Sequence, residues 1–218
     1  IGYLVVLIVF WKLSGKQVTK QIRKLLGNLS AGILRIPQGL YYNKTHTWTF
    51  LEASGNAKVG LDDFLQHITG KVNFSKLKNS GEQIRKGELL TEIDQNGKKL
   101  KIFSPLSGEI ISVNSLLHDT PEILNEDPYD QGWLYEIKPS SWIAETNSYY
   151  LAEEATNWSK KELDRFKDFV MGGPMRKYSS QPSMAVLQDG GELRDHILSD
   201  LPNEVWEDFQ EEFLDQKK

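Results

Sequence analysis

Short runs of strand-forming residues alternate with turn residues between positions 39 and 142. Residues 47–51 read Thr-Trp-Thr-Phe-Leu, and residues 89–93, 100–103 and 109–113 are also rich in β-branched or large apolar side chains. Glycine, asparagine and serine separate these runs, as is typical of turns between short strands. The pattern predicts a mainly β central domain over residues 39–142.

The turn at Asn96-Gly97 is the most specific local signal in this domain. Asn-Gly between two apolar runs favours a type I′ turn, because both central residues of that turn need positive φ. After the turn, Leu100 and Ile102 alternate with Lys99 and Lys101. A slip of one residue would exchange the two faces of the strand and bury the lysines, so the pattern indicates one register.

Helical spacing dominates the region after the central domain. Ser159 and Glu162 have the spacing of a capping box, which predicts a helix that begins at the serine. The apolar positions that follow lie on one stripe: Leu163, Phe166 and Val170. Gly172-Gly-Pro174 ends this pattern. We therefore expect a helical extension over residues 143–171 and a linker over residues 172–198.

An acidic amphipathic helix is expected over residues 199–218, with its regular part from Pro202 to about position 214. Trp206, Phe209 and Phe213 fall on one face, and acidic residues cover the other. A helix this short is marginal alone in water, so the aromatic face must be buried. We expect it to dock on a partner protein, and folding back onto the central domain is the alternative.

The first residues, 1–11, form an apolar run with only one polar side-chain group, the hydroxyl of Tyr3. This run is shorter than a membrane span, so we expect it to be the end of a transmembrane helix that begins upstream. Tyr3 and Trp11 are suited to a membrane interface, and basic residues follow at once: Lys12, Lys16 and Lys20. A basic juxtamembrane helix and linker are expected over residues 12–38, in contact with lipid, and the main domain is placed on the cytoplasmic side of a single-pass protein. A buried core helix is the alternative for residues 1–11.

The composition of the chain limits the kinds of binding and catalytic sites that it can form. The net charge of −4 argues against a general nucleic-acid binder, and the absence of cysteine excludes thiolate metal sites and cysteine nucleophiles. No two of the histidines have the spacing of a metal-binding helix face. The paired carboxylates Asp62 and Asp63 lie at an expected helix start, where negative charge favours the helix dipole, so we do not assign them to catalysis. We expect neither a catalytic site nor a metal site.

The central domain resembles the H protein of the glycine cleavage system. The resemblance covers just under half of the chain and rests on several blocks in the order and at the spacing of that family: His46-Thr-Trp48, Val59-Gly-Leu-Asp-Asp-Phe-Leu-Gln-His-Ile-Thr-Gly70, Lys86-Gly-Glu88, Ser104-Pro-Leu-Ser-Gly108, Pro121-Glu-Ile-Leu-Asn-Glu-Asp-Pro-Tyr129, Gly132-Trp133 and Ile137-Lys-Pro139. It implies a lipoyl-domain-like flattened sandwich of short strands, with a hairpin that carries a lipoyl group on a lysine.

In this resemblance the position of the lipoyl-lysine is Gly97, and Lys98 is the next residue. Lipoate attachment needs a primary amine, which glycine lacks. Lys98 is the fallback position if the hairpin slips by one residue. We therefore expect no cofactor, with lipoate on Lys98 as the alternative.

Together these features predict a membrane-anchored, non-enzymatic, non-lipoylated accessory or scaffold subunit of a larger membrane complex, such as a redox or transport assembly. Its partners are expected to be other protein subunits and membrane lipid. One alternative is a lipoyl carrier that uses Lys98 to shuttle intermediates between enzymes. Another is a membrane adaptor for glycine-cleavage-type enzymes.

Overall fold

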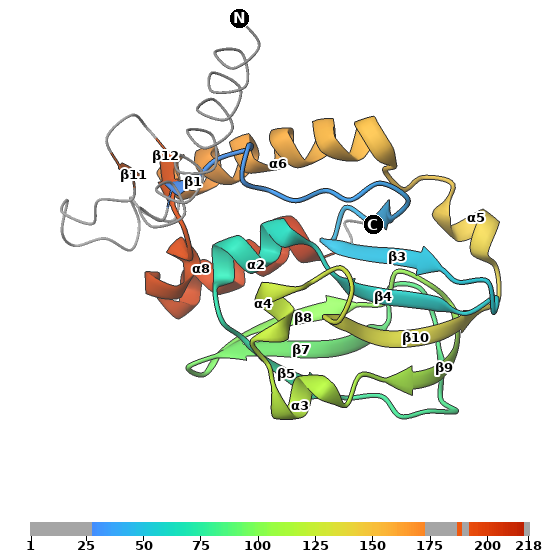
Figure 1. The fold of residues 1–218 in the computed structure, drawn as a ribbon. Coiled ribbons are helices and arrows are strands. Elements are labelled where there is room, and N and C mark those ends of the chain that lie inside the picture. The colour runs from blue at the N-terminus through green and yellow to red at the C-terminus, as the bar shows by residue number, and fades with distance from the viewer. Residues whose placement is uncertain (1–27, 173–186, 189–191, 216–218) are drawn as a thin grey trace, which may run out of the picture.

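A computed structural model describes residues 28–172, 187–188 and 192–215 of the chain. Its centre is a flattened β sandwich (Figure 1). One sheet has six strands in the order β2-β3-β4-β10-β9-β6, and the other has three in the order β5-β7-β8. The bounds of these strands are β2 Tyr41–Tyr42, β3 Thr47–Leu51, β4 Ala57–Leu61, β5 Asn73–Lys76, β6 Gln83–Ile84, β7 Leu89–Gln95, β8 Lys98–Phe103, β9 Gly108–Val113 and β10 Trp133–Pro139. The expected mainly β domain is confirmed, and β3 has the predicted bounds.

Short helices connect the strands of the sandwich and close its ends. They are α2 Asp63–Thr69, α3 Leu116–Asp119, α4 Ile123–Glu126 and α5 Trp142–Thr146. The side chain of Asp62 caps α2 by accepting a hydrogen bond from the Leu65 amide, and Asp63 opens the helix. The expectation that these two carboxylates mark a helix start is therefore confirmed.

The predicted hairpin forms in the predicted register. Gln95 pairs with Lys98 across a two-residue turn in which both Asn96 and Gly97 have positive φ, 54° and 86°. Leu100 and Ile102 are fully buried, whereas Lys99 and Lys101 face solvent. The alternation in the sequence thus determined which face of β8 enters the core.

The long helix of the extension begins before Ser159, the start that the capping box predicts. Helix α6 spans Ala152–Gly172 and runs along one side of the sandwich, while α3 lies on the opposite side (Figure 1). Ser159 and Glu162 are buried in the middle of α6, so the predicted capping box is wrong. The spacing of Ser159 and Glu162 is that of a capping box, but the Glu162 carboxylate contacts His46 instead of capping a helix start.

The expected linker over residues 172–198 is partly structured. Strands β11 (Leu187–Gln188) and β12 (Glu192–Arg194) form a small sheet with β1 (Asn28–Leu29), in the order β1-β12-β11. Asn28 pairs with Arg194 and Leu29 with Leu193. The two extensions of the central domain are therefore joined to each other.

The last element packs against the protein's own core. A short 3₁₀ helix η1 (Ile197–Asp200) precedes α8 (Asn203–Phe209), which continues as the π-helical turn η2 (Gln210–Leu214). The exposed fractions of Trp206, Phe209 and Phe213 are 0%, 0% and 2%. The structure therefore corrects the expected docking of this aromatic face on a partner, and the alternative of folding back holds. The pattern indicated burial but could not distinguish an internal surface from an external one.

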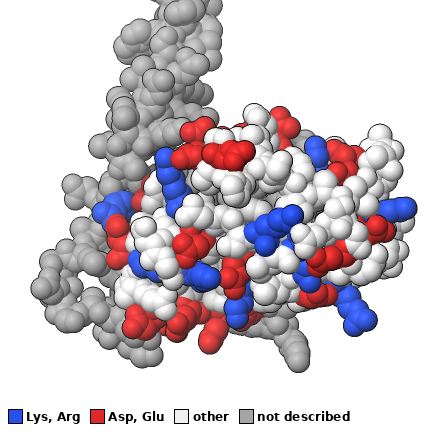
Figure 2. Space-filling view, turned by 90° about the horizontal axis from the view of Figure 1, so that it is seen from below, with Lys and Arg blue, Asp and Glu red and all other residues white. Residues whose placement is uncertain are grey.

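The predictions for the first residues fall outside the described part of the chain. This applies to the expected transmembrane segment 1–11 and to Tyr3, Trp11, Lys12, Lys16 and Lys20. Within residues 28–172, 187–188 and 192–215, no helix combines the length and the apolar composition that a membrane crossing requires. Figure 2 shows acidic and basic side chains interspersed over one face of the molecule, without a large basic field.

Candidate functional site

The tip of the β7–β8 hairpin is open to solvent at the turn itself. Asn96 and Gly97 are both exposed, and a Cβ added at Gly97 would meet no atom within 4 Å. A side chain at position 97 would therefore project freely from the tip. Glycine provides no amine there, so this position does not fit a covalently attached lipoyl group.

Lys98, the fallback acceptor, is held by the chain itself. Its Nζ donates hydrogen bonds to the carbonyl oxygens of Ser199 and Leu201, both at 2.7 Å. It also lies 5.8 Å from the ring centre of Trp206, within the range of a cation–π contact. The carbonyls and the indole belong to residues 195–214, which we call the C-terminal segment.

The C-terminal segment also covers the outer edge of β8. The side chain of Gln210 accepts a hydrogen bond from the Lys101 amide at 2.7 Å and donates one to the Lys101 carbonyl at 3.2 Å. It thus takes the place of a neighbouring strand at one residue of an edge that would otherwise be open to pairing. The hairpin is therefore held at two points, Lys98 and Lys101.

Aromatic packing fixes the C-terminal segment to α6. Phe209 and Phe213 stack at 4.7 Å, and each meets Phe166 edge-on, at 5.8 and 5.9 Å. The Arg165 guanidinium lies 3.9 Å from the ring centre of Phe213. These side chains are part of the main hydrophobic core, so the segment is an integral part of the fold.

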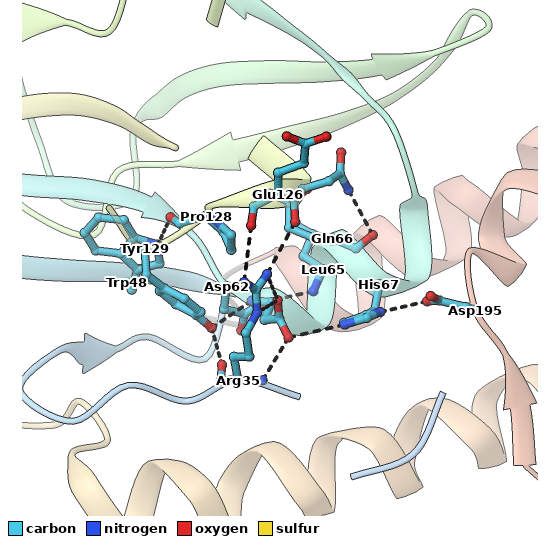
Figure 3. Close-up of polar contacts among 12 residues, drawn as sticks. Arg35, Trp48, Asp62, Leu65, Gln66, His67, Glu126, Pro128, Tyr129 and Asp195 are labelled. Atoms are coloured by element: carbon cyan, nitrogen blue, oxygen red, sulfur yellow. Dashed lines mark hydrogen bonds and ion pairs between the residues drawn. The ribbon is translucent and has the colours of Figure 1, made fainter. Parts of the chain in front are cut away.

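A buried carboxylate, Asp63, ties three distant parts of the chain together. Figure 3 labels Arg35 and His67, which contact it, and Asp195 beyond His67. It accepts two hydrogen bonds from the Arg35 side chain and one from the Arg35 amide, and His67 lies 3.3 Å away. His67 in turn contacts Asp195 at 2.8 Å. Burial opposes ionisation of Asp63, but His67 and Arg35 outweigh it and lower the pKa of that carboxyl.

A second buried ion cluster surrounds His46. Its Nδ1 is 2.7 Å from Asp62 and its Nε2 is 3.3 Å from Glu162, while the ring stacks on Phe64 at 4.4 Å. The Nε2 contact is close but poorly aligned for a hydrogen bond, so we treat it as an ion pair. Burial disfavours the imidazolium, yet the two carboxylates prevail and raise the pKa of His46 to about 9.

Sequence reasoning identified neither cluster. No local signal links His46 to Glu162 or Asp63 to Arg35. Within the described part of the chain, no group of three histidine, aspartate or glutamate side chains is placed to hold a metal ion. Both clusters connect helices and extensions, which is a structural role.

Comparison with known proteins agrees with the fold. The family model described as "Glycine cleavage H-protein" matches residues 40–162. A probable glycine cleavage system H protein of Thermococcus gammatolerans is 36% identical over 125 residues, which are 57% of this chain and 92% of that protein. The H protein of Hydrogenovibrio crunogenus is 39% identical over 104 residues, which are 48% of this chain and 81% of that protein.

A solved structure of the same family has a similar fold. The crystal structure of a glycine cleavage system H protein from Mycobacterium marinum matches with a TM-score of 0.50 at 26% identity, covering 56% of this chain and 98% of the other. The family match ends at Glu162, within α6, so β1, the β11–β12 pair and the C-terminal segment lie outside it. Because the family model covers more than half of the sequence, the chain belongs to the glycine cleavage H-protein family.

Proposed function

We propose that this chain is a non-lipoylated, non-enzymatic accessory subunit that uses the H-protein fold to bind other proteins. The proposal is supported by the hairpin tip. The spacing of the sequence blocks assigns the lipoyl position to Gly97, and the amine of Lys98 is bound by the chain's own carbonyls. Homologues in this family are lipoyl carriers. A carrier needs an amine that is displayed and free to move, and neither position 97 nor position 98 offers one.

Intact mass spectrometry of the protein purified from its native source tests the absence of lipoate. We expect no added lipoyl mass on the protein, and peptide mapping should find the hairpin lysines unmodified. An added lipoyl group that maps to Lys98 or Lys99 would refute the proposal and support the carrier alternative. A Lys98→Arg variant is the control, because it keeps the positive charge and cannot accept lipoate.

We further propose that the partners are protein subunits of a larger membrane complex. The support is the sequence alone: the apolar run 1–11, followed by Lys12, Lys16 and Lys20, suits attachment to a membrane with the main domain on the cytoplasmic side. Fractionation should leave the native protein in the membrane after carbonate washing. Release by carbonate would contradict a span, and digestion of the central domain by protease added to sealed right-side-out vesicles would contradict the orientation.

Purification in mild detergent distinguishes the accessory subunit from an adaptor for glycine-cleavage-type enzymes. Capture of membrane proteins in fixed proportion supports the accessory role. Capture of glycine-cleavage enzymes instead supports the adaptor, which family membership favours as the second candidate.

A further inference from the structure

The lysine next to the hairpin tip has an unusual set of contacts for a side chain on an exposed hairpin. Lys98 donates to two main-chain carbonyls at 2.7 Å, and the indole of Trp206 covers it. An ammonium group has three donors, so the two carbonyls satisfy most of its hydrogen-bonding capacity. The neighbouring Lys99 is 57% exposed and makes a single ion pair with Glu92.

The carbonyls that hold Lys98 are themselves firmly placed. Ser199 belongs to η1 and Leu201 follows directly, and the amide of Leu201 donates to the carbonyl of Leu198 at 3.1 Å. Trp206 donates from its indole nitrogen to the same Leu198 carbonyl at 2.7 Å. The two carbonyls are therefore held in place by contacts that do not involve Lys98.

Contacts also fix the chain just before η1, at His196. His196 has a φ of 59°, and its amide donates to the His67 carbonyl at 2.7 Å. A left-handed residue other than glycine persists only where surrounding contacts hold it. The chain turns sharply here from β12 into η1, which directs the Ser199 and Leu201 carbonyls toward the hairpin.

We propose that the C-terminal segment masks Lys98, so that this amine is unavailable to acyl donors while position 97 at the tip stays open. The inference rests on the proposed function only in taking Gly97 as the lipoyl position. It adds that two separate features leave the hairpin tip without an acceptor for an acyl group. Position 97 has no lysine, and the amine of Lys98 is bound within the chain.

The chemistry of acylation explains why these contacts mask the amine. The neutral amine attacks an activated acyl carbon, the new N–C bond forms, the bond to the leaving group breaks, and the nitrogen loses a proton. An amine bound by two carbonyls and covered by an indole must break these contacts before it can turn toward an acyl carbon. Acylation of Lys98 therefore requires that its side chain first leave the two carbonyls, or that the C-terminal segment open, which its buried aromatic side chains oppose.

Competitive labelling of the full chain tests the mask. The folded protein is treated with a limiting amount of the N-hydroxysuccinimide ester of acetate, and acetylation of each lysine is measured by peptide mass spectrometry. We expect Lys98 to react about tenfold more slowly than Lys99 and Lys101, and at the same rate as these neighbours in denaturant. Equal rates for Lys98 and Lys99 in the folded protein would overturn the proposal.

A Gly97→Lys variant is the matched control. The new side chain has open space around its Cβ, so it should react like the exposed lysines, with a modest loss of stability from the positive φ at this position. Slow labelling at both 97 and 98 would mean that the whole tip is shielded, and the specific mask on Lys98 would be refuted.

Hydrogen exchange gives a readout that does not depend on labelling. A Lys98→Gln variant, which is neutral like an acylated lysine, should speed exchange of the amides at positions 199 and 201 several-fold, and Lys98→Arg should do so less. Unchanged exchange in Lys98→Gln would show that the ammonium does not bind the segment. The two proposals fail separately, because a reactive Lys98 in a protein without lipoate refutes only the mask, and lipoate on Lys99 refutes only the proposed function.

Discussion

Replacing Glu162 with glutamine tests how the His46 cluster holds α6 against the sandwich. His46 is fully buried, and its two ring nitrogens face carboxylates from different parts of the chain, Asp62 beside α2 and Glu162 on α6. The Glu162→Gln change keeps the size of the side chain and removes only its charge. Asp62→Asn makes the same change at the shorter contact and retains a residue that can cap α2.

The geometry gives different magnitudes for the two variants. Removal of one partner of a fully buried ion pair costs about 3–5 kcal/mol, and we expect this for Asp62→Asn because its contact is 2.7 Å and its exposure is 1%. The Glu162 contact is longer and poorly aligned, and His46 keeps its other partner, so we expect about 1–2 kcal/mol. For a chain of this size, the expected losses of melting temperature are about 2–8 °C for Glu162→Gln and two to three times more for Asp62→Asn.

The same cluster predicts a pH dependence. Burial opposes the charge of His46, but the carboxylates around it raise the pKa of His46 to about 9 in the folded protein, against 6.5 for a free histidine. Burial opposes the charge of His67 too, but Asp195 and Asp63 raise the pKa of His67 to about 9. Because the folded pKa is the higher one, the stabilisation is fully present below pH 6.5 and is lost as the pH rises through 9. For His46 alone the difference corresponds to about 3 kcal/mol.

Chemical denaturation at several pH values measures both effects, with Glu154→Gln as the control because Glu154 is an exposed acid on the same helix. The reasoning would be refuted by a wild-type unfolding free energy that does not change between pH 6.5 and pH 9. A Glu162→Gln variant less stable than Asp62→Asn would show that the assigned order of the two contacts is wrong.

Other substitutions probe the packing of the remaining parts. Trp206→Ala should lower the unfolding free energy by about 3–5 kcal/mol in the isolated protein, measured by denaturant titration, because its ring is fully buried in the chain's own core. Gly60→Ala should cost about 1–3 kcal/mol, because the new Cβ would lie 2.5 Å from the Trp48 ring, and a crystal structure of the variant should show that ring displaced. Arg35→Gln should speed hydrogen exchange in β1 without affecting the hairpin, because Arg35 pairs with the buried Asp63 near the start of the described chain.

The sequence was informative where a local rule and the tertiary environment agreed. The Asn96-Gly97 turn and the alternation after it determine both the geometry and the faces of the hairpin. Asp62 caps α2 as a polar residue before an apolar run commonly does. In these cases the information lies within a few residues, so it can be read without knowledge of the fold.

Prediction failed where the partner of a residue lies far along the chain. Ser159 and Glu162 have the spacing of a cap, but Glu162 pairs with His46, which is 116 residues away by number. The aromatic face of the last helix indicated burial, and the same pattern would suit a partner protein or the hairpin. Nothing in the spacing of Lys98 reveals that carbonyls at positions 199 and 201 bind it.

The pairing of β1 with β12 has a consequence for the order in which the protein can be made. Asn28 leaves the ribosome long before its partner Arg194, because about 165 residues of synthesis at 5–20 residues per second take on the order of ten seconds. During that interval the outer edge of β8 and the core surface that later receives Trp206 have no cover. Completion of the fold therefore waits for residues 195–214. A nascent chain arrested before position 206 would be a substrate for chaperones or a source of aggregates, and removal of the C-terminus would not give a minimal domain.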